Sequence, residues 1–338
     1  MKMDTYNESR INTPNMTFQT PTFSISVALS ISTILIGSIV TFINVSVLVA
    51  AMKCSPKKQN AHFNLVVGLT FTDICSGLNL LVNGIRLSFS TLYLKPIFCA
   101  TATVVLSVAI LASVTQTFFI CFNRLLSISN SSLNKKIFSK RNTYIICVAN
   151  WATAISLVLI FVDINSIINR QIICNIHTVF GENFEWFRYN YCCCCIVVVA
   201  LTIFLYFVAL HMLRKVSRKT HVSSIAEGIA RRDSRNLSDN RTTFDTAESN
   251  STYPSSVSRD TRKISQSMKT VGLIIVALTC LTGPLIIAYL IDTASQPAIL
   301  LTTNLAVLNS LVNPFLYCHK IKILRIQLRL MFCRCCPL

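Results

Sequence analysis

The chain alternates between long apolar stretches and polar connections. Seven apolar stretches lie near residues 24–51, 62–88, 98–122, 143–167, 190–213, 270–291 and 297–318. Each is about long enough for an α-helix to cross a hydrocarbon core of about 30 Å. Lipid offers the backbone no hydrogen-bond partners, so only helices or closed barrels span it, and stretches of this length exclude barrel strands. The pattern predicts an all-α, polytopic membrane protein built as a bundle of seven transmembrane helices.

The polar segments complete the predicted organisation. We expect an extracellular N-terminal tail over 1–23, the bundle over 24–318, and a cytoplasmic amphipathic helix with a short tail over 319–338. Residues 216–264, between spans five and six, are rich in Ser, Thr, Asn and Arg, which predicts a largely disordered cytoplasmic loop. In the C-terminal segment, cations share one helical side and apolar residues another, which predicts a short interfacial helix on the inner leaflet.

Composition and charge support lipid as the solvent. Of 338 residues, 52% are hydrophobic and 13% are charged, whereas a soluble domain carries about 25% charged residues. The net charge of +18 would suggest a nucleic-acid partner if the protein were soluble. With the N-terminus outside, however, 25 of the 31 Lys and Arg residues lie on the inner side. The positive-inside rule therefore predicts an extracellular N-terminus at the plasma membrane, with membrane lipid and no nucleic acid as partner.

Several side chains outside the spans are candidate modification sites. Two asparagines lie in N-glycosylation sequons: Asn7 and Asn15. Three cysteines after the interfacial helix are candidates for palmitoylation: Cys333, Cys335 and Cys336. Cys99 and Cys174 both face the oxidising side, which favours a disulfide bond that would hold the outer loop over the helix mouth. The run Cys192–Cys195 is interpreted as a small apolar helix surface, because free Cys packs as a small hydrophobe.

One acidic side chain lies in the middle of a span. Asp73 interrupts the second apolar stretch, and a buried carboxylate costs several kcal/mol unless it is paired. Its candidate partners on spans three and seven are Ser113, Asn309, Ser310 and Asn313. A carboxylate with several hard oxygens suits a small alkali cation such as Na⁺, or a proton. A protonated Asp held by its neighbours is the alternative.

Two prolines interrupt predicted helices. Pro314, in Asn313-Pro-Phe-Leu-Tyr317, removes a backbone hydrogen bond from span seven, and we expect Asn313 to point at the freed polar groups. Pro284 follows Gly283 in span six, which predicts a hinge that could swing the inner end of that helix. Static kinks are the alternative at both positions.

Taken together, these features resemble a rhodopsin-like (class A) G-protein-coupled receptor over about residues 24–336. The matching residues are Asn44, Asp73, Cys99 followed 25 positions later by Arg124, Trp151, Tyr206, Pro284 and Asn313-Pro314-x-x-Tyr317. The resemblance implies an outer ligand pocket, an outward movement of helix six and a cytoplasmic cleft for a heterotrimeric G protein. It further implies that Arg124 contacts the G protein and that Tyr206 and Tyr317 stabilise the open state. The implied sodium site, which favours the inactive state, comprises Asp73, Ser113, Asn309 and Asn313.

The sequence departs from the family pattern at three points. Asn123 stands before Arg124 where an aspartate is usual, so the charged restraint on the arginine is missing and raised basal activity is expected. Leu-Thr-Gly-Pro over 281–284 replaces the usual Cys-Trp-x-Pro, so the aromatic toggle is absent. Val198 stands in span five where a proline is usual.

The resemblance also constrains the ligand. Leu106 stands where amine receptors have an Asp, and Val307 stands where opsins have a Lys, so neither a monoamine nor retinal is expected. The inferred pocket is mostly apolar and comprises Leu106, Ile110, Thr282, Leu285, Ile286, Tyr289, Thr303 and Val307. The charges at its rim are Arg86, Asp163, Glu185, Arg188 and Asp292. This pattern suits a peptide held at the mouth or a lipid-like ligand and does not choose between them.

The long inner loop contains candidate regulatory sites. Ser234 and Ser265 each follow basic residues, which is typical of basic-directed kinase sites. A receptor kinase and arrestin are therefore expected partners, and a merely solvated linker is the alternative.

Two other classes of function fit the sequence less well. A membrane transporter or channel, the main alternative, should show repeated halves or several intramembrane charges, whereas this chain has one central acid and no repeat. An enzyme is not expected, because the spans hold no Ser/His/Asp or His-rich set.

Overall fold

The computed structural model describes residues 23–54, 61–88, 96–169, 176–238, 256–291 and 295–332. Within these ranges the chain forms helices and no strands. The long helices are α1 (Phe23–Met52), α2 (Ala61–Ser88), α3 (Pro96–Ser129), α5 (Lys140–Leu159), α8 (Phe184–Ser238), α9 (Ser256–Leu290) and α10 (Gln296–Lys320). The short ones are α4 (Ser131–Ile137), α6 (Ile164–Asn169), α7 (Ile176–Phe180), η2 (Gly181–Asn183) and α11 (Lys322–Phe332). Seven helices are long and apolar enough to cross a membrane, which confirms the predicted seven-helix membrane protein.

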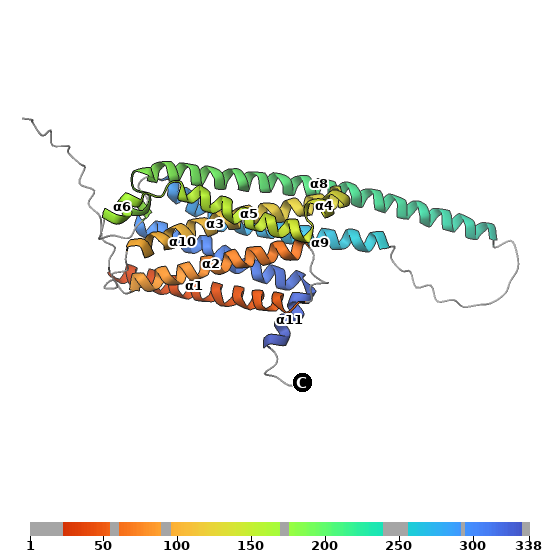
Figure 1. Cartoon of the computed structure of the whole chain (residues 1–338). Helices are drawn as coiled ribbons and strands as arrows, with labels where there is room; N and C mark the ends of the chain where they lie inside the picture. The colour runs from red at the N-terminus through yellow and green to blue at the C-terminus, as the bar shows by residue number, and fades with distance from the viewer. Residues whose placement is uncertain are drawn as a thin grey trace, which may run out of the picture.

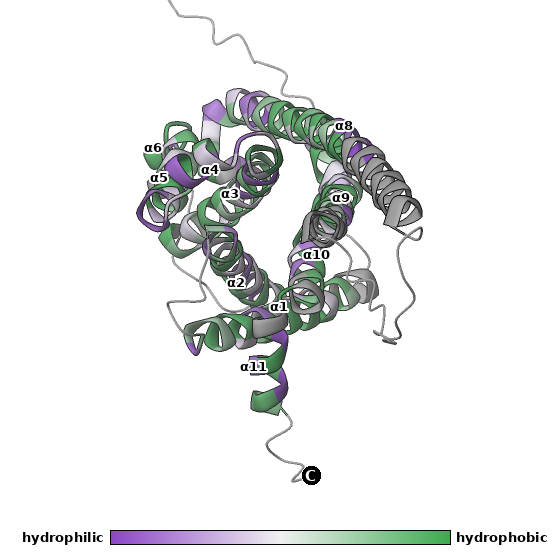
Figure 2. Ribbon diagram, turned by 90° about the vertical axis from the view of Figure 1, so that its right-hand side faces the viewer, coloured by the Kyte–Doolittle hydropathy of each residue, from purple (hydrophilic) through white to green (hydrophobic). Residues whose placement is uncertain are grey.

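The long helices lie alongside one another, and all of them except α5 form a ring (Figures 1 and 2). Each neighbouring pair is in contact, from α1 and α2 through α3, α8 and α9 to α10 and back to α1, with α5 outside α2 and α3. The end of the bundle near α4 and α11 is called the inner end, and the end near α6 and α7 is called the outer end. Figure 2 colours much of the ring as hydrophobic. Large apolar side chains such as Phe42, Phe204 and Phe207 are more than 60% exposed. Exposed side chains of this kind are suited to contact with lipid.

Glycines allow α1 and α2 to approach closely. A methyl group on residue 37 would lie 2.5 Å from the backbone nitrogen of Leu81, and one on residue 84 would lie 2.8 Å from that of Ile34. Gly77 is equally close to Val40 and Thr41 of α1. Small residues of this kind let backbones pack directly in a membrane, where dispersion contacts drive helix association.

Two apolar clusters fill the ends of the bundle. The inner cluster joins α1, α2, α3, α9 and α11 and includes Phe63, Ile120 and Leu324. The outer cluster joins α3, α5, α7 and α8 around Phe180 and Phe187, whose rings stack with centroids 3.7 Å apart. The short α7 therefore closes the outer end over α3 and α8.

The prediction of a disordered loop over 216–264 is wrong for its two ends. Helix α8 continues to Ser238, and α9 already begins at Ser256. The segment 216–238 contains no proline and several good helix formers among its Ala, Arg, Lys and Glu residues, so a preceding transmembrane helix can propagate through it. Figure 1 shows α8 extending well beyond the bundle.

The fourth span ends earlier than predicted. Helix α5 stops at Leu159, and α6 begins at Ile164 after a turn. The Asp163 carboxylate accepts a hydrogen bond from the backbone N–H of Asn165 at 3.0 Å, which caps α6. The predicted amphipathic helix of the C-terminal segment is present as α11, where the Phe332 and Phe42 ring centroids are 6.5 Å apart.

Candidate functional site

Asp73 lies in the middle of α2, and its side chain is fully buried. The Asn313 side-chain amide donates a hydrogen bond to the Asp73 Oδ2 atom at 3.1 Å, which joins α2 to α10. The other carboxylate oxygen has no hydrogen-bond partner, and neither do the side-chain oxygens of Ser113, Asn309 and Asn313. Buried oxygens of this kind are costly unless something pairs with them.

A small polar cavity lies beside these groups. Its polar lining residues are Ser76, Ser113, Thr282, Asn309 and Ser310. The space open to the centre of a water-sized sphere is about 10 Å³, which is enough for about one water molecule or one small cation. A carboxylate and several unpartnered hard oxygens are ligands that small hard cations prefer. The residues present therefore fit a monovalent cation such as Na⁺.

Asn44 satisfies the backbone at the proline of α10. Pro314 has no N–H to donate to the carbonyl of Ser310, four residues earlier. The fully buried Asn44 amide donates to that carbonyl at 3.0 Å and to the carbonyl of Val40 at 2.9 Å. We expected Asn313 to bond the backbone groups that Pro314 leaves free, and this expectation is wrong. The Asn313 amide donates to Asp73 instead, and Asn44 of α1 donates to the freed carbonyl.

Arg124 lies at the inner end of α3 without a charged partner. Its buried Nε atom has no hydrogen-bond partner, and the arginine forms no ion pair with any described residue. The neighbouring Asn123 is 3% exposed and donates its side-chain amide to Asn134 Oδ1 of α4 at 3.0 Å. Asn123 therefore links α3 to α4. No charged side chain in the described part of the chain pairs with the Arg124 guanidinium.

Tyr206 of α8 packs against a glycine of α9. A methyl group on Gly272 would clash with the Tyr206 hydroxyl and would lie 2.8 Å from its ring Cζ atom. Met268 of α9, which is 1% exposed, belongs to an apolar cluster with Leu213 of α8 and Leu125 of α3. Helices α3, α8 and α9 are thus packed together toward the inner side of the bundle.

The predicted ligand-pocket residues fall into neighbouring groups at the outer half. Ile110 and Leu285 pack with Leu106 and Tyr289 in one apolar cluster. Four further contacts place the remaining members. Val307 packs against Leu80 and Val40, and Thr282 lines the small cavity near Ser113. Ile286 joins the outer cluster, while the Thr303 hydroxyl donates to the carbonyl of Ile299 in its own helix at 2.7 Å.

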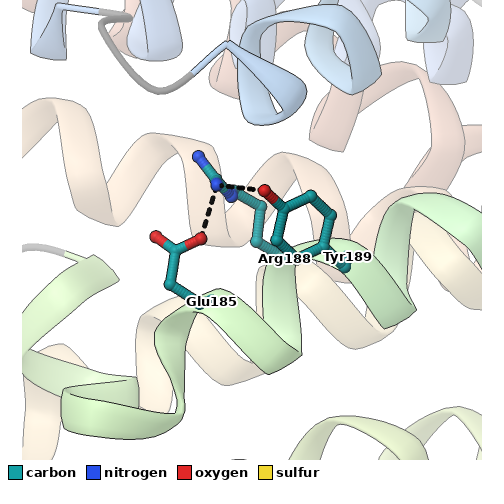
Figure 3. A network of polar contacts seen from close by, with 3 residues as sticks. All are labelled: Glu185, Arg188 and Tyr189. Carbon is teal, nitrogen blue, oxygen red and sulfur yellow. Dashed lines mark hydrogen bonds and ion pairs between the residues drawn. The ribbon is translucent and has the colours of Figure 1, made fainter.

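A buried arginine lies at the outer end of α8 (Figure 3). Arg188 is 4% exposed and donates to the carboxylate of Glu185, which is 55% exposed, and to the Tyr189 hydroxyl at 3.0 Å. Arg188 was predicted at the rim, but its side chain is enclosed. Nearby, burial lowers the pKa of His177 despite the opposing charge of Glu185, and Arg188 lowers it further.

An unpredicted hydrogen-bond network joins α2, α3 and α5. The Asn150 amide donates to the carbonyl of Ala112 at 3.0 Å and to Gln116 Oε1 at 3.2 Å. Gln116 in turn donates to the carbonyl of Leu65 at 3.1 Å, and the Thr115 hydroxyl donates to Asn150 Oδ1. The sequence signal was the presence of two amide side chains within apolar spans, where unpaired polar groups are costly.

Several predicted site residues lie outside the described residues. They are Asn7, Asn15, Cys174, Asp292, Cys333, Cys335 and Cys336. The helical backbone at Cys99 and Tyr317 is described, but their side chains are not. The disulfide, glycosylation and palmitoylation sites and the role of Tyr317 therefore stay predictions.

Comparison with known proteins identifies one family. The family model for the 7 transmembrane receptor (rhodopsin family) matches residues 43–317. The matched region begins just before Asn44 and ends at Tyr317, so it includes every motif residue from which the resemblance was argued. No curated protein sequence matches the chain.

Proposed function

The chain belongs to the rhodopsin family of seven-transmembrane receptors, and we propose that it detects an extracellular ligand and activates a heterotrimeric G protein. It is a multi-pass membrane protein, and the charge distribution supports an extracellular N-terminus at the plasma membrane. The observation that carries the proposal is Arg124, a cation without a charged partner among the described residues, at the end of the bundle where α3, α8 and α9 pack together.

The proposed activation step is an outward movement of the inner half of α9. Pro284 lies inside α9, and a methyl group on the preceding Gly283 would meet no atom within 4 Å, although Thr282 and Leu285 on either side are buried. Movement about it would separate Met268 from α3 and give a G protein access to Arg124. Because no acid among the described residues pairs with the arginine, charge does little to hold the closed state, which supports raised basal activity.

A sodium ion would favour the closed state. Asp73, Ser113, Asn309 and Asn313 would hold it, using the oxygens that lack partners. The ion supplies a positive charge that offsets the buried carboxylate. The four side chains belong to α2, α3 and α10, so their convergence keeps these helices together while Asn313 remains hydrogen-bonded to Asp73.

The ligand proposed is a peptide or a lipid-like molecule that carries an anionic group. Among the described residues, the two most deeply buried charged side chains are Asp73 and Arg188. Asp73 lies deep beside Asn313, so the outer half offers a cation and no buried acid. An acidic group could replace the exposed Glu185 carboxylate at Arg188, while an apolar body reaches Tyr289 and Leu106.

We propose that phosphorylation between spans five and six and palmitoylation after α11 regulate the receptor. Ser234 and Ser265 are proposed substrates of a receptor kinase, and their phosphorylation would create a docking site for arrestin. Palmitoylation after α11 would add a second membrane anchor to its apolar side.

The test is guanine-nucleotide exchange in membranes that contain the full-length receptor and purified G proteins. Wild-type receptor should stimulate exchange without added ligand, and Arg124→Ala should abolish it at matched surface expression. Asn123→Asp should lower basal exchange, because an aspartate can pair with the guanidinium. Lys135→Ala, at an exposed cation of α4, is the matched control and should leave exchange unchanged. No stimulation of any G protein by the wild type, with or without a screened ligand, would contradict the proposal.

A further inference from the structure

Two buried nitrogen atoms at the inner end of the bundle have no hydrogen-bond partner among the described residues. One is the Nε atom of Arg124 on α3, and the other is the Nδ1 atom of His62 on α2. The two side chains are close enough for the charge of the arginine to act on the imidazole. A buried donor without a partner is costly, and the cost is larger when its group is charged. A single acceptor placed beside both nitrogens would remove this cost.

The described part of the protein supplies no counter-charge at this place. Six of its helices contain no Asp or Glu at all: α1, α3, α4, α5, α10 and α11. The one acid of α2 is Asp73, which follows His62 by eleven residues, or about 16 Å of helix. Asn123, the residue before Arg124, is uncharged. Because a buried cation without an ion pair is costly, an anion from solution would stabilise it.

The surroundings of the two nitrogens favour such an anion. Phe63, next to His62, and Leu126, two residues after Arg124, both belong to the apolar inner cluster. An apolar environment strengthens the attraction between a guanidinium and an anion. The two terminal nitrogens of the guanidinium bond to no described residue and are not among the buried atoms, so an ion can reach them from the inner side.

We propose that a small inorganic anion such as chloride binds between Arg124 and His62. The anion offsets the guanidinium charge and accepts hydrogen bonds from Arg124 Nε and His62 Nδ1. A neutral imidazole carries its proton on either nitrogen, so an anion beside Nδ1 selects the tautomer that donates there. Guanidinium is weakly hydrated, which favours chloride and bromide over the strongly hydrated fluoride.

The site gives the receptor a removable substitute for an acid beside Arg124, and this consequence rests on the proposed function. A bound anion would hold the guanidinium in the closed state. A G protein that contacts Arg124 must displace the anion, so the anion favours the closed state over the open one. Basal nucleotide exchange should therefore fall several-fold as chloride replaces gluconate at constant sodium concentration and ionic strength.

The binding test uses full-length receptor in detergent and chloride NMR, in which bound chloride broadens the line of the free ion. Wild-type receptor should broaden the line, and added bromide should reverse the broadening by competition. Arg124→Gln removes the charge and should lose most of the broadening. Lys135→Gln removes an exposed cation of α4 and is the matched control, which should retain it. Replacing gluconate by chloride should raise the unfolding temperature by roughly 2–5 °C in the wild type and in Lys135→Gln, and should leave it unchanged in Arg124→Gln.

Two further variants test the contacts of the anion. His62→Phe removes the second donor and should weaken chloride binding roughly tenfold, the cost of about one hydrogen bond. Asn123→Asp supplies an internal carboxylate and should abolish both the broadening and the chloride dependence of exchange. Broadening that survives in Arg124→Gln, or an unfolding temperature that is the same in chloride and in gluconate, would overturn the proposal. Because the NMR measurement requires no G protein, it separates failure of this site from failure of the proposed function.

Discussion

The two proline-containing helices, α9 and α10, differ in how neighbouring side chains satisfy the backbone beside the proline. At Pro314 in α10, the freed carbonyl of Ser310 accepts a hydrogen bond from Asn44 of α1, and the adjacent Asn313 bonds Asp73 of α2. At Pro284 in α9, no described side chain donates to the backbone one turn earlier, and the space beside Gly283 is empty out to 4 Å. A neighbouring helix therefore satisfies the backbone beside Pro314, whereas no described side chain does so beside Pro284, where the hinge is proposed.

The difference shows that a proline alone does not predict mobility. What matters is whether neighbouring helices satisfy the backbone groups that the proline frees, because an unsatisfied group in lipid is costly. Asn44 and Asp73 make α10 part of a rigid frame with α1 and α2. The contacts that hold α9 closed are apolar and lie at its inner end, around Met268 and Gly272.

The largest expected effect follows from removing the hydrogen bond between Asn44 and the Ser310 carbonyl, beside Pro314. Asn44→Leu would leave the Ser310 carbonyl buried without its side-chain donor, which should lower the free energy of unfolding by about 1–3 kcal/mol. The measurement is thermal unfolding of detergent-purified receptor. Ser46→Leu, on the exposed side of α1, is the control and should unfold near the wild-type temperature. Equal stability of Asn44→Leu and wild type would show that the kink is not held as described.

The second expected effect concerns the link between α2 and α10. Asp73→Asn keeps the size of the side chain and removes its charge, so the site should no longer attract a cation. Basal nucleotide exchange of the wild type should fall as Na⁺ replaces a large organic cation at constant ionic strength. Exchange by Asp73→Asn should not respond. A sodium response that persists in the variant would place the ion elsewhere.

A smaller effect is expected at the contact that closes α9. Gly272→Ala would place a methyl group against the Tyr206 ring, so the ring and the inner end of α9 must move apart. Basal exchange should rise several-fold relative to Leu273→Ala, a lipid-facing change on the same turn. Unchanged basal exchange, with both variants equally expressed, would mean that this contact does not hold the closed state.

The smallest effect is expected at the hinge itself. An alanine at position 283 meets no atom within 4 Å, and it favours helix over glycine by about 1 kcal/mol. Gly283→Ala should therefore leave stability unchanged or slightly raised and should reduce stimulated exchange modestly. Enhanced exchange would contradict the assignment of a hinge to this position.

The sequence was sufficient for the fold and for part of the site. Seven apolar stretches specify seven spans, because lipid leaves the backbone no other solution, and Asp73 and Asn313 stood out as polar groups in apolar surroundings. The bond from Asn44 to Ser310 could not be predicted, since it depends on how α1 lies against α10. The same holds for Gly272, whose importance appears only when Tyr206 is seen against it.

Two further features depended on tertiary context. Arg188 carries a charge, which predicts a position at the exposed rim, yet its side chain is enclosed beside Glu185 and Tyr189. The segment 216–238 has the composition of a linker, yet a transmembrane helix that precedes it has already met the cost of nucleation and continues through it.

The most direct test of the central claim compares movement on the inner sides of the two prolines. Fluorescent noncanonical amino acids at residues 144 and 269 would report the distance from α5 to the inner end of α9. A second pair at residues 144 and 315 would report the distance from α5 to α10 beyond Pro314. On addition of a G protein stripped of nucleotide, the 144–269 distance should increase by several ångströms and the 144–315 distance should stay constant. Equal shifts of both pairs, or a shift of α10 alone, would contradict the account.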